Sequence, residues 1–263
     1  TNGDWGATSP VELDTSASTA GDGGSVDLTD EWLVVGNSAS GGTKFFVFKN
    51  INGDGSVWDL GDRIFNVNPW DARPNDLRGW GGNVRIGDGN RWIGLQSRTD
   101  PSTLSIFENV DGTWTQKAWS DGSMYLGCTM SECPRHGSGN VKGWGYSRFA
   151  MTDNYLAVGS FEKLFVFACV DGVWNANPVR VYDGSDYPGT PMISYQTPRL
   201  TMNDRFILAG DFNTGQVVLF PNVDGSWVKS TTVFDLVGKK PTGMTDTGVW
   251  IVRQDDILHY PPV

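Results

Sequence analysis

Four stretches of the chain alternate apolar residues with polar or β-branched ones and end in the same kind of turn. In residues 104–114 this alternation leads into Asp111-Gly112, and Trp114 follows directly. An Asp-Gly pair is typical of a two-residue β-hairpin turn, because both turn residues need positive φ. The other copies lead through Gly53-Asp54-Gly55 to Trp58, through Asp171-Gly172 to Trp174 and through Asp224-Gly225 to Trp227. Four hairpins of one type predict a repeat protein.

A second constant pattern precedes each hairpin: a short strand, a tight turn and a strongly apolar strand. Its clearest copy is residues 148–151, the turn Thr152-Asp153-Asn154, and residues 155–159. Further copies lie at 25–36, 83–95, 199–210 and 242–252. The chain therefore holds five units.

The fifth unit reaches the end of the sequence after its third strand, at residues 257–263. The missing turn and fourth strand have counterparts at the other end, in Asn2-Gly3-Asp4-Trp5 and residues 10–14. We therefore predict an all-β protein, a single five-bladed β-propeller of four-stranded antiparallel blades over residues 1–263, whose ring is closed by the N-terminal strand. The expected blades are about 24–68, 82–125, 146–183, 198–237, and 242–263 together with 1–14.

The repeat resembles a known family. Residues 144–160 combine Trp144-Gly145, an inner strand, a Thr-Asp turn and an apolar strand that ends in Val158-Gly159. With the following Val-Phe and Asp-Gly-x-Trp elements, this is similar to the FG-GAP-like repeats of integrin α-chain-type propellers and of many secreted proteins. The resemblance implies a propeller fold and an extracellular setting. The chain departs from the integrin type in having five units instead of seven and three-residue turns where calcium loops would stand.

The composition limits the kinds of partner that the protein is expected to bind. The net charge of −10 opposes binding to nucleic acid and to anionic membrane surfaces. No run of about 18 apolar residues predicts a membrane span. Cys128 and Cys133 lie close together in a stretch with Gly, Ser and Pro, where a disulfide is one interpretation and two free thiols the other. Cys169 falls in a predicted strand and is expected to be a small buried apolar residue.

Strand alternation places the one-to-two turns and the Asp-Gly hairpins on one face, where they are short and uniform. The long connections, roughly 59–82, 115–146, 175–198 and 228–241, share the opposite face, and irregular loops on a rigid scaffold often carry binding sites. On that face we single out five candidate ligand-binding residues with flat or cationic side chains suited to sugar rings or planar groups. They are Trp80, Trp144, Tyr195, Arg78 and Lys142. The alternative is that the aromatic-Gly residues only pack between blades, which we also expect of the five tryptophans of the hairpin turns.

Aligned inner strands give a column that faces either the central channel or the neighbouring blade: Asp27, Arg85, Ala150, Thr201 and Gly243. A glycosidase site needs at least two carboxylates there, one with a raised pKa. The column offers one carboxylate, with Arg85 next to it, which predicts an ion pair between blades. Carboxylates on the long connections could add to it: Asp71, Asp76, Asp183 and Asp186.

The sequence favours no cofactor and no metal site. Two histidines, His136 and His259, are too few for a multi-histidine site, and the nucleophile-elbow and phosphate-loop motifs are absent from the sequence. The leading hypothesis is a secreted or cell-surface, lectin-like binding propeller without catalysis, whose partner is a glycan or a protein. Two alternatives stay open: a structural module of an extracellular complex, and a glycoside hydrolase-like enzyme with carboxylates in the funnel.

Overall fold

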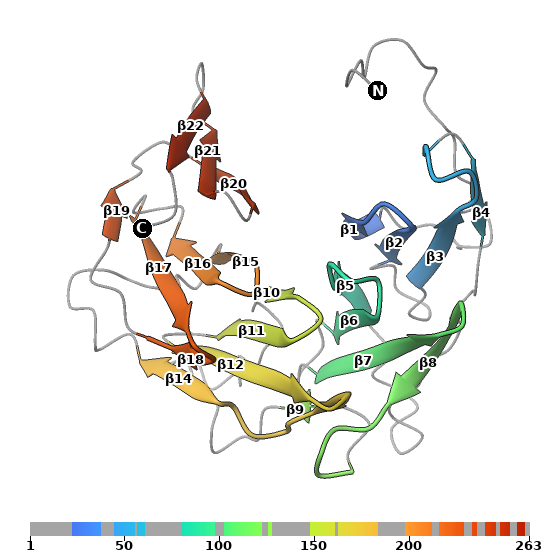
Figure 1. Ribbon diagram of the computed structural model, residues 1–263, viewed down its shortest axis with the longest axis horizontal. Coiled ribbons are helices and arrows are strands. Elements are labelled where there is room, and N and C mark those ends of the chain that lie inside the picture. Colours follow the sequence, from blue (N-terminus) through green and yellow to red (C-terminus); the bar gives the residue numbers. More distant parts are fainter. Residues whose placement is uncertain are drawn as a thin grey trace, which may run out of the picture.

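The computed structural model describes residues 23–37, 45–55, 57–60, 80–97, 103–122, 126–127, 148–160, 163–183, 198–211, 216–228, 233–235, 240–245, 248–252 and 257–260. These residues form antiparallel sheets that radiate from a common centre (Figure 1). Among them, no helix is long and apolar enough to cross a membrane.

Four sheets have the strand order of a propeller blade, one to four from the centre outward. Blade 1 consists of β1 (Gly23–Leu28), β2 (Trp32–Asn37), β3 (Phe45–Asn50) and β4 (Trp58–Leu60). Blade 2 consists of β5 (Trp80–Ile86), β6 (Trp92–Ser97), β7 (Thr103–Val110), β8 (Thr113–Lys117) and β9 (Leu126–Gly127). Blade 3 consists of β10 (Arg148–Met151), β11 (Tyr155–Ser160), β12 (Lys163–Val170), β13 (Val173–Trp174) and β14 (Arg180–Asp183). Blade 4 consists of β15 (Pro198–Met202), β16 (Phe206–Asp211), β17 (Gln216–Val223), β18 (Ser226–Trp227) and β19 (Val233–Asp235).

The outermost strand of blades 2, 3 and 4 comes in two pieces that pair with the same third strand. In blade 3, β13 pairs with the end of β12 and β14 with its beginning. Backbone bonds hold the chain close to β12 on both sides of the break, from Asn175 N to Ala168 O at 3.0 Å and from Val179 N to Val166 O at 2.7 Å. Each blade is thus four strands wide.

The inner strands β1, β5, β10, β15 and β20 (Lys240–Thr245) follow one another around the centre (Figure 1). With β21 (Gly248–Val252) and β22 (Ile257–Tyr260), β20 forms a three-stranded sheet beside blade 4. The predicted β-propeller of four-stranded antiparallel blades is confirmed, with four complete blades. The segment predicted to complete a fifth, residues 1–14, lies outside the described residues.

Each apolar core lies between two blades. One core joins Trp32 and Val34 of blade 1 to Val84 and Ile86 of blade 2, and the next two cores repeat this between blades 2 and 3 and between blades 3 and 4. Each core combines aliphatic side chains with several large aromatic ones, which bury a large apolar area each. Blades therefore depend on their neighbours for stability.

Three of the five hairpin tryptophans pack between blades, as predicted, whereas Trp58 is half-buried and its Nε1 donates to the carbonyl of Gly55 in its own turn at 3.0 Å. Trp114 of blade 2 meets Trp32 of blade 1 edge to face at 5.5 Å between ring centres. Trp174 of blade 3 meets Trp92 of blade 2 at 5.8 Å, and Trp227 of blade 4 meets Tyr155 of blade 3 at 5.2 Å, both in the same edge-on arrangement. One aromatic contact thus recurs at three successive interfaces.

Three of the four Asp-Gly turns have the conformation that the sequence predicts; in the blade 1 turn Gly53 and Gly55 have positive φ, but Asp54 does not. Asp111, Asp171 and Asp224 have φ between 51° and 52°, and the glycine after each also has positive φ. Positive φ at both central residues defines the type I′ turn that matches strand twist. The prediction that these hairpins share a face with the one-to-two turns is also confirmed, because the Nδ2 of Asn222, at the end of β17, donates to the carbonyl of Asp204 at 2.8 Å.

Candidate binding site

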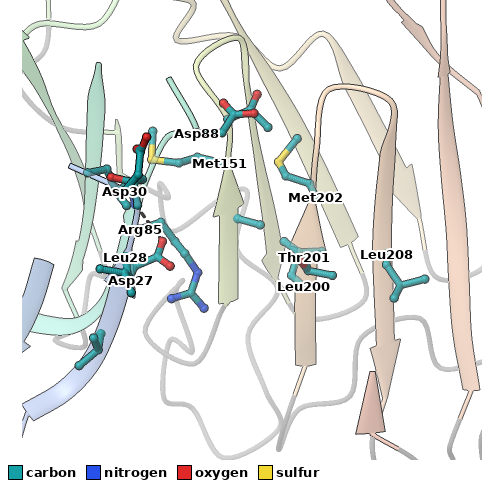
Figure 2. Close-up of a pocket in the computed structure, with 15 residues that line it drawn as sticks. Asp27, Leu28, Asp30, Arg85, Asp88, Met151, Leu200, Thr201, Met202 and Leu208 are labelled. Atoms are coloured by element: carbon teal, nitrogen blue, oxygen red, sulfur yellow. Dashed lines mark hydrogen bonds between the residues drawn. The ribbon is translucent and has the colours of Figure 1, made fainter. Parts of the chain in front are cut away.

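The inner strands surround a cavity of about 810 Å³ in the central channel (Figure 2). Its lining includes the four predicted column residues Asp27, Arg85, Ala150 and Thr201, one from each complete blade. The fifth member, Gly243, belongs to β20, whose side-chain surroundings the structure does not describe. Apolar side chains fill much of the remaining wall, among them Met151, Met202, Leu200 and Leu208. Seven of the fifteen lining residues are polar or charged, so the cavity lacks the predominantly apolar wall of a typical small-molecule pocket.

Asp27 links blade 1 to blade 2 through the backbone. Its Oδ2 accepts a hydrogen bond from the backbone N of Ile86 at 2.9 Å, and the Oγ of Ser25, on the same strand, accepts one from the N of Val84 at 2.7 Å. Burial raises the pKa of Asp27, and the nearby positive charge of Arg85 counteracts part of that rise.

The predicted Asp27–Arg85 ion pair needs correction. The two side chains are near neighbours (Figure 2), but the Nη1 of Arg85 donates to the carbonyl of Val84 at 2.8 Å. The blade-to-blade hydrogen bond recorded for Asp27 ends on the Ile86 backbone. The alignment of the inner strands correctly placed both residues at the cavity. It could not show that each side chain would have a backbone group within hydrogen-bonding distance.

Two further carboxylates, Asp30 and Asp88, line the same cavity. Both lie in one-to-two turns, which the sequence interpretation treated as scaffold and so excluded from the column. Asp30 Oδ1 accepts from Asn90 Nδ2 of blade 2 at 3.2 Å, and Asp88 Oδ1 accepts from the backbone N of Asp153 of blade 3 at 3.2 Å. The sequence feature that could have identified them is an acidic residue within the turn that follows the inner strand.

Asp153 shows why glycine occupies the blade 2 turn. A Cβ at Gly87 would lie 2.2 Å from Asp153 Oδ1, and one at Gly89 would lie 2.1 Å from Oδ2. Burial and the charge of Asp88 raise the pKa of Asp153, whereas hydrogen bonds from the backbones of Arg91 and Gly89 work in the opposite direction. The carboxylate of blade 3 is thus seated in the turn of blade 2.

The turn of blade 4 is bound to blade 3 in a similar way. Asp204 accepts hydrogen bonds from the Thr152 hydroxyl and from Asn154 Nδ2, the latter at 2.6 Å. The Thr29 hydroxyl likewise donates to Asn90 between blades 1 and 2. Side-chain hydrogen bonds therefore join the turns of all four complete blades at this end of the channel.

Of the five predicted ligand-binding residues, the structure describes only the backbone of Trp80. Trp80 is the first residue of β5, where its backbone pairs with Ser97, although its side chain is not among those described. Arg78, Lys142, Trp144 and Tyr195 lie outside the described residues, as do Cys128 and Cys133 of the predicted disulfide. Cys169 lies in β12 as predicted, is a free cysteine and is partly exposed.

Asp183, considered above as an additional carboxylate of the funnel, does not lie at the channel. Asp183 ends the outer strand β14, and its Oδ2 lies 3.6 Å from the Nζ of Lys163. That position is at the rim of blade 3, because β14 pairs with the third strand and not with an inner one. Asp71, Asp76 and Asp186 lie outside the described residues. Within the described part of the chain, no group of three or more His, Cys, Asp or Glu side chains is arranged to hold a metal ion.

Comparison with known proteins finds only distant likenesses among solved structures. No family model matches the chain, and no curated protein matches it either. Among solved structures, it is similar to Kluyveromyces lactis Hsv2, at 11% identity and a TM-score of 0.46 over 88% of this chain and 56% of that one. It is also similar to the periplasmic gluconolactonase PpgL of Pseudomonas aeruginosa, at 12% identity and a TM-score of 0.45 over 86% of this chain and 64% of that one. The corresponding values for AofleA from Arthrobotrys oligospora are 12%, 0.44, 86% and 62%. The chain spans less than two thirds of the length of each.

Proposed function

We propose that the protein is a secreted or cell-surface binding propeller that recognises a carbohydrate or a protein through its long-loop face and carries out no chemistry of its own. The ring that we propose has five blades with FG-GAP-like repeats, and residues 1–14 complete the sheet of β20–β22.

One observation carries the proposal: the two ends of the channel differ. At one end, short turns are bound together by side-chain hydrogen bonds such as Asn154 to Asp204. The opposite end is where the long connections enter the inner strands, and Trp80 is the first residue of β5 there. In the sequence, Trp144 and Tyr195 shortly precede β10 and β15, so we place them at that same end. A rigid scaffold with variable loops at one end is a common arrangement for recognition.

The test is a glycan-array screen of the purified protein, followed by Trp144→Ala and Trp80→Ala. We expect selective binding that either substitution weakens at least tenfold, while the urea unfolding midpoint changes little. Val223→Ala is the matched control, because Val223 is an exposed side chain beside the blade 4 hairpin. A lower unfolding midpoint for Trp144→Ala, with binding weakened no more than by the control, would contradict a role in recognition and favour packing between blades.

A glycoside hydrolase is the second candidate, because Asp27, Asp30 and Asp88 line one cavity. Burial raises the pKa of Asp27, as a general acid requires. Asp27 is nevertheless tied to the Ile86 backbone, so we favour a structural role for it. Sugar release from array-positive glycans that Asp27→Asn and Asp88→Asn each abolish would establish hydrolysis instead.

Two exposed valines at the outer edge of blade 3 support an assembly role. Val179 lies just before β14, and Val181 lies within it. Light scattering of the intact protein over a hundredfold concentration range tests it. Association that Val181→Lys reverses would favour the assembly module over the binding propeller.

A further inference from the structure

The aspartates that precede a glycine differ in one hydrogen bond. At an Asp-Gly pair the backbone nitrogen of the glycine can attack the aspartate side chain, because glycine has no Cβ to obstruct the approach. A hydrogen bond donated by that N–H opposes the attack, since the nitrogen must lose its proton and move toward the carboxyl carbon. Six such pairs lie wholly within the described residues: Asp54-Gly55, Asp88-Gly89, Asp111-Gly112, Asp121-Gly122, Asp171-Gly172 and Asp224-Gly225.

In blades 1 and 2 an asparagine side chain holds the glycine N–H of the hairpin turn. Gly55 N donates to Asn50 Oδ1 at 3.2 Å, and Gly112 N donates to Asn109 Oδ1 at 2.9 Å. The glycine N–H is bonded in three further pairs, with these acceptors: the Trp119 carbonyl for Gly122 at 2.8 Å, the Asp153 carboxylate for Gly89 and the Cys169 thiol for Gly172. Five of the six pairs are thus held by this bond.

The Asp224-Gly225 turn of blade 4 lacks it. Asn222 has the same register as Asn109, and its Nδ2 likewise donates to the one-to-two turn. Its buried Oδ1, however, accepts no hydrogen bond from any described residue, Gly225 included. Backbone conformation is not the difference, because φ is 52° at both Asp111 and Asp224. Both Asp224 and Gly225 are exposed, so water reaches them.

We propose that Asp224-Gly225 is a site of spontaneous aspartate isomerisation, the fastest among the six pairs. The Gly225 nitrogen bonds to Cγ of Asp224, and the hydroxyl of the protonated carboxyl leaves as water with the proton of that nitrogen. Water then opens the resulting cyclic imide. Attack on its main-chain carbonyl carbon gives isoaspartate, whereas attack on the side-chain carbonyl carbon restores aspartate.

The product changes the hairpin next to a contact between blades. In isoaspartate the chain runs through the side chain, so one backbone atom is added before Gly225 and the former main-chain carboxyl becomes a charged branch. Trp227 follows directly after this turn and the next residue, and its ring packs edge-on against Tyr155 of blade 3 at 5.2 Å. The modification therefore acts on the interface between blades 3 and 4, and it is independent of the binding function proposed above.

Peptide mapping of the intact protein after prolonged incubation at neutral pH measures isoaspartate at each pair. We expect it to form about fivefold faster at Asp224 than at Asp111, the factor to which one ordinary hydrogen bond corresponds. Asp111 is the matched control within the same molecule, because Val-Asp-Gly is common to both turns and the Gly112 N–H is bonded. In urea, where the fold no longer holds Gly112, the two rates should become equal.

Two substitutions test the cause. Asn109→Ala frees the Gly112 N–H and should raise the Asp111 rate to that of Asp224, whereas Asn222→Ala should leave the Asp224 rate unchanged. Each variant also loses the same Nδ2 bond to a one-to-two turn, so the two are matched in that loss. If either variant fails to fold, the folded and urea-treated wild type decide alone.

Equal rates at Asp111 and Asp224 in the folded wild type would overturn the proposal. So would a preference for Asp224 that persists in urea, because the neighbouring sequence and not the hydrogen bond would then set the rate. An Asp111 rate that folded Asn109→Ala leaves unchanged would also contradict it.

Discussion

The inner strands of blades 1 and 2 present equivalent apolar side chains, yet their surroundings differ. Val84 and Ile86 of β5 are 0% and 5% exposed, because blade 1 covers them. Val26 and Leu28 of β1, at the same register positions, are 56% and 55% exposed. Val26 and Leu28 alternate with the polar Ser25 and Asp27, so β1 has one apolar face and one polar face. The comparison teaches that the apolar face of β1 is open in the described structure, whereas its counterpart on β5 is covered by a neighbouring blade.

The largest expected effect lies inside an interface between complete blades. Trp174 is 1% exposed and contacts both Trp92 and Trp119. Trp174→Ala should lower the free energy of unfolding by about 3–5 kcal/mol, as large-to-small changes in a core do. Trp58→Ala, at the equivalent half-buried position of blade 1, should cost only about 1–2 kcal/mol. Urea denaturation of both variants measures the difference, and equal losses would show that the two positions are equally enclosed.

Leu28 and Ile86 provide the next test, at the two faces compared above. Ile86→Ala should cost about 2–5 kcal/mol, because Ile86 is enclosed by the core between blades 1 and 2. A fifth blade seated on β1 would make Leu28→Ala cost at least 2 kcal/mol as well, and this is the result we expect. A Leu28→Ala effect within about 0.5 kcal/mol, typical of surface positions, would contradict the closed ring.

A smaller increase in stability is expected from blade 3, which lacks a side-chain hydrogen bond that recurs in blades 1, 2 and 4. Asn50, Asn109 and Asn222 lie at or one residue before the end of the third strands of their blades, and each Nδ2 donates to a backbone carbonyl of the one-to-two turn. Cys169 holds the same register in blade 3, where its N donates to Asn154 O as the N of Asn109 does to Arg91 O.

Cys169→Asn should therefore raise the free energy of unfolding by about 1 kcal/mol through the added hydrogen bond. Thermal unfolding measures it, and Cys169→Ser is the control, because serine removes the thiol but is too short to make the same bond. Equal stability of the two variants would show that the asparagine does not reach the turn.

The smallest expected effect concerns pH. Burial and Asp88 raise the pKa of Asp153 above its ordinary value of 3.8. A carboxyl whose pKa is raised in the folded protein binds protons more tightly there. Its contribution to stability therefore decreases as pH rises from the unfolded pKa through the folded one. Asp153→Asn should remove this decrease, measured as the difference in unfolding free energy from the wild type between pH 4 and pH 7.

Glu108 is the opposite control for that titration. Burial works to raise its pKa, but hydrogen bonds from Lys117 and Arg91 bring the pKa below its ordinary value. The stability that Glu108 contributes is therefore lost as pH falls through its folded pKa. Glu108→Gln should change the pH dependence in the opposite direction to Asp153→Asn, and a change of the same sign in both would contradict the assignment.

The repeat could be predicted because its signals are local. Asp111-Gly112 favours a two-residue turn with positive φ at both residues, and a tryptophan two residues later falls on a fixed side of the hairpin. The channel column followed from strand alternation, which placed Asp27 and Thr201 on one cavity. Asp30 and Asp88 were missed because turn residues have no periodicity that would aim them at the channel. The candidate residues on the long connections could not be placed relative to one another for the same reason.

The order of strands within each blade has a consequence for how the chain reaches this structure. The strands of β1-β2-β3-β4 and their counterparts in the later sheets pair with neighbours in sequence, and β9, β14 and β19 each skip only one short strand. Such contacts have low contact order and close early, as in repeat proteins where each unit assembles on the one before. Under the closed-ring proposal, joining residues 1–14 to β20–β22 spans nearly the whole chain. We expect it to be the last and slowest event of folding.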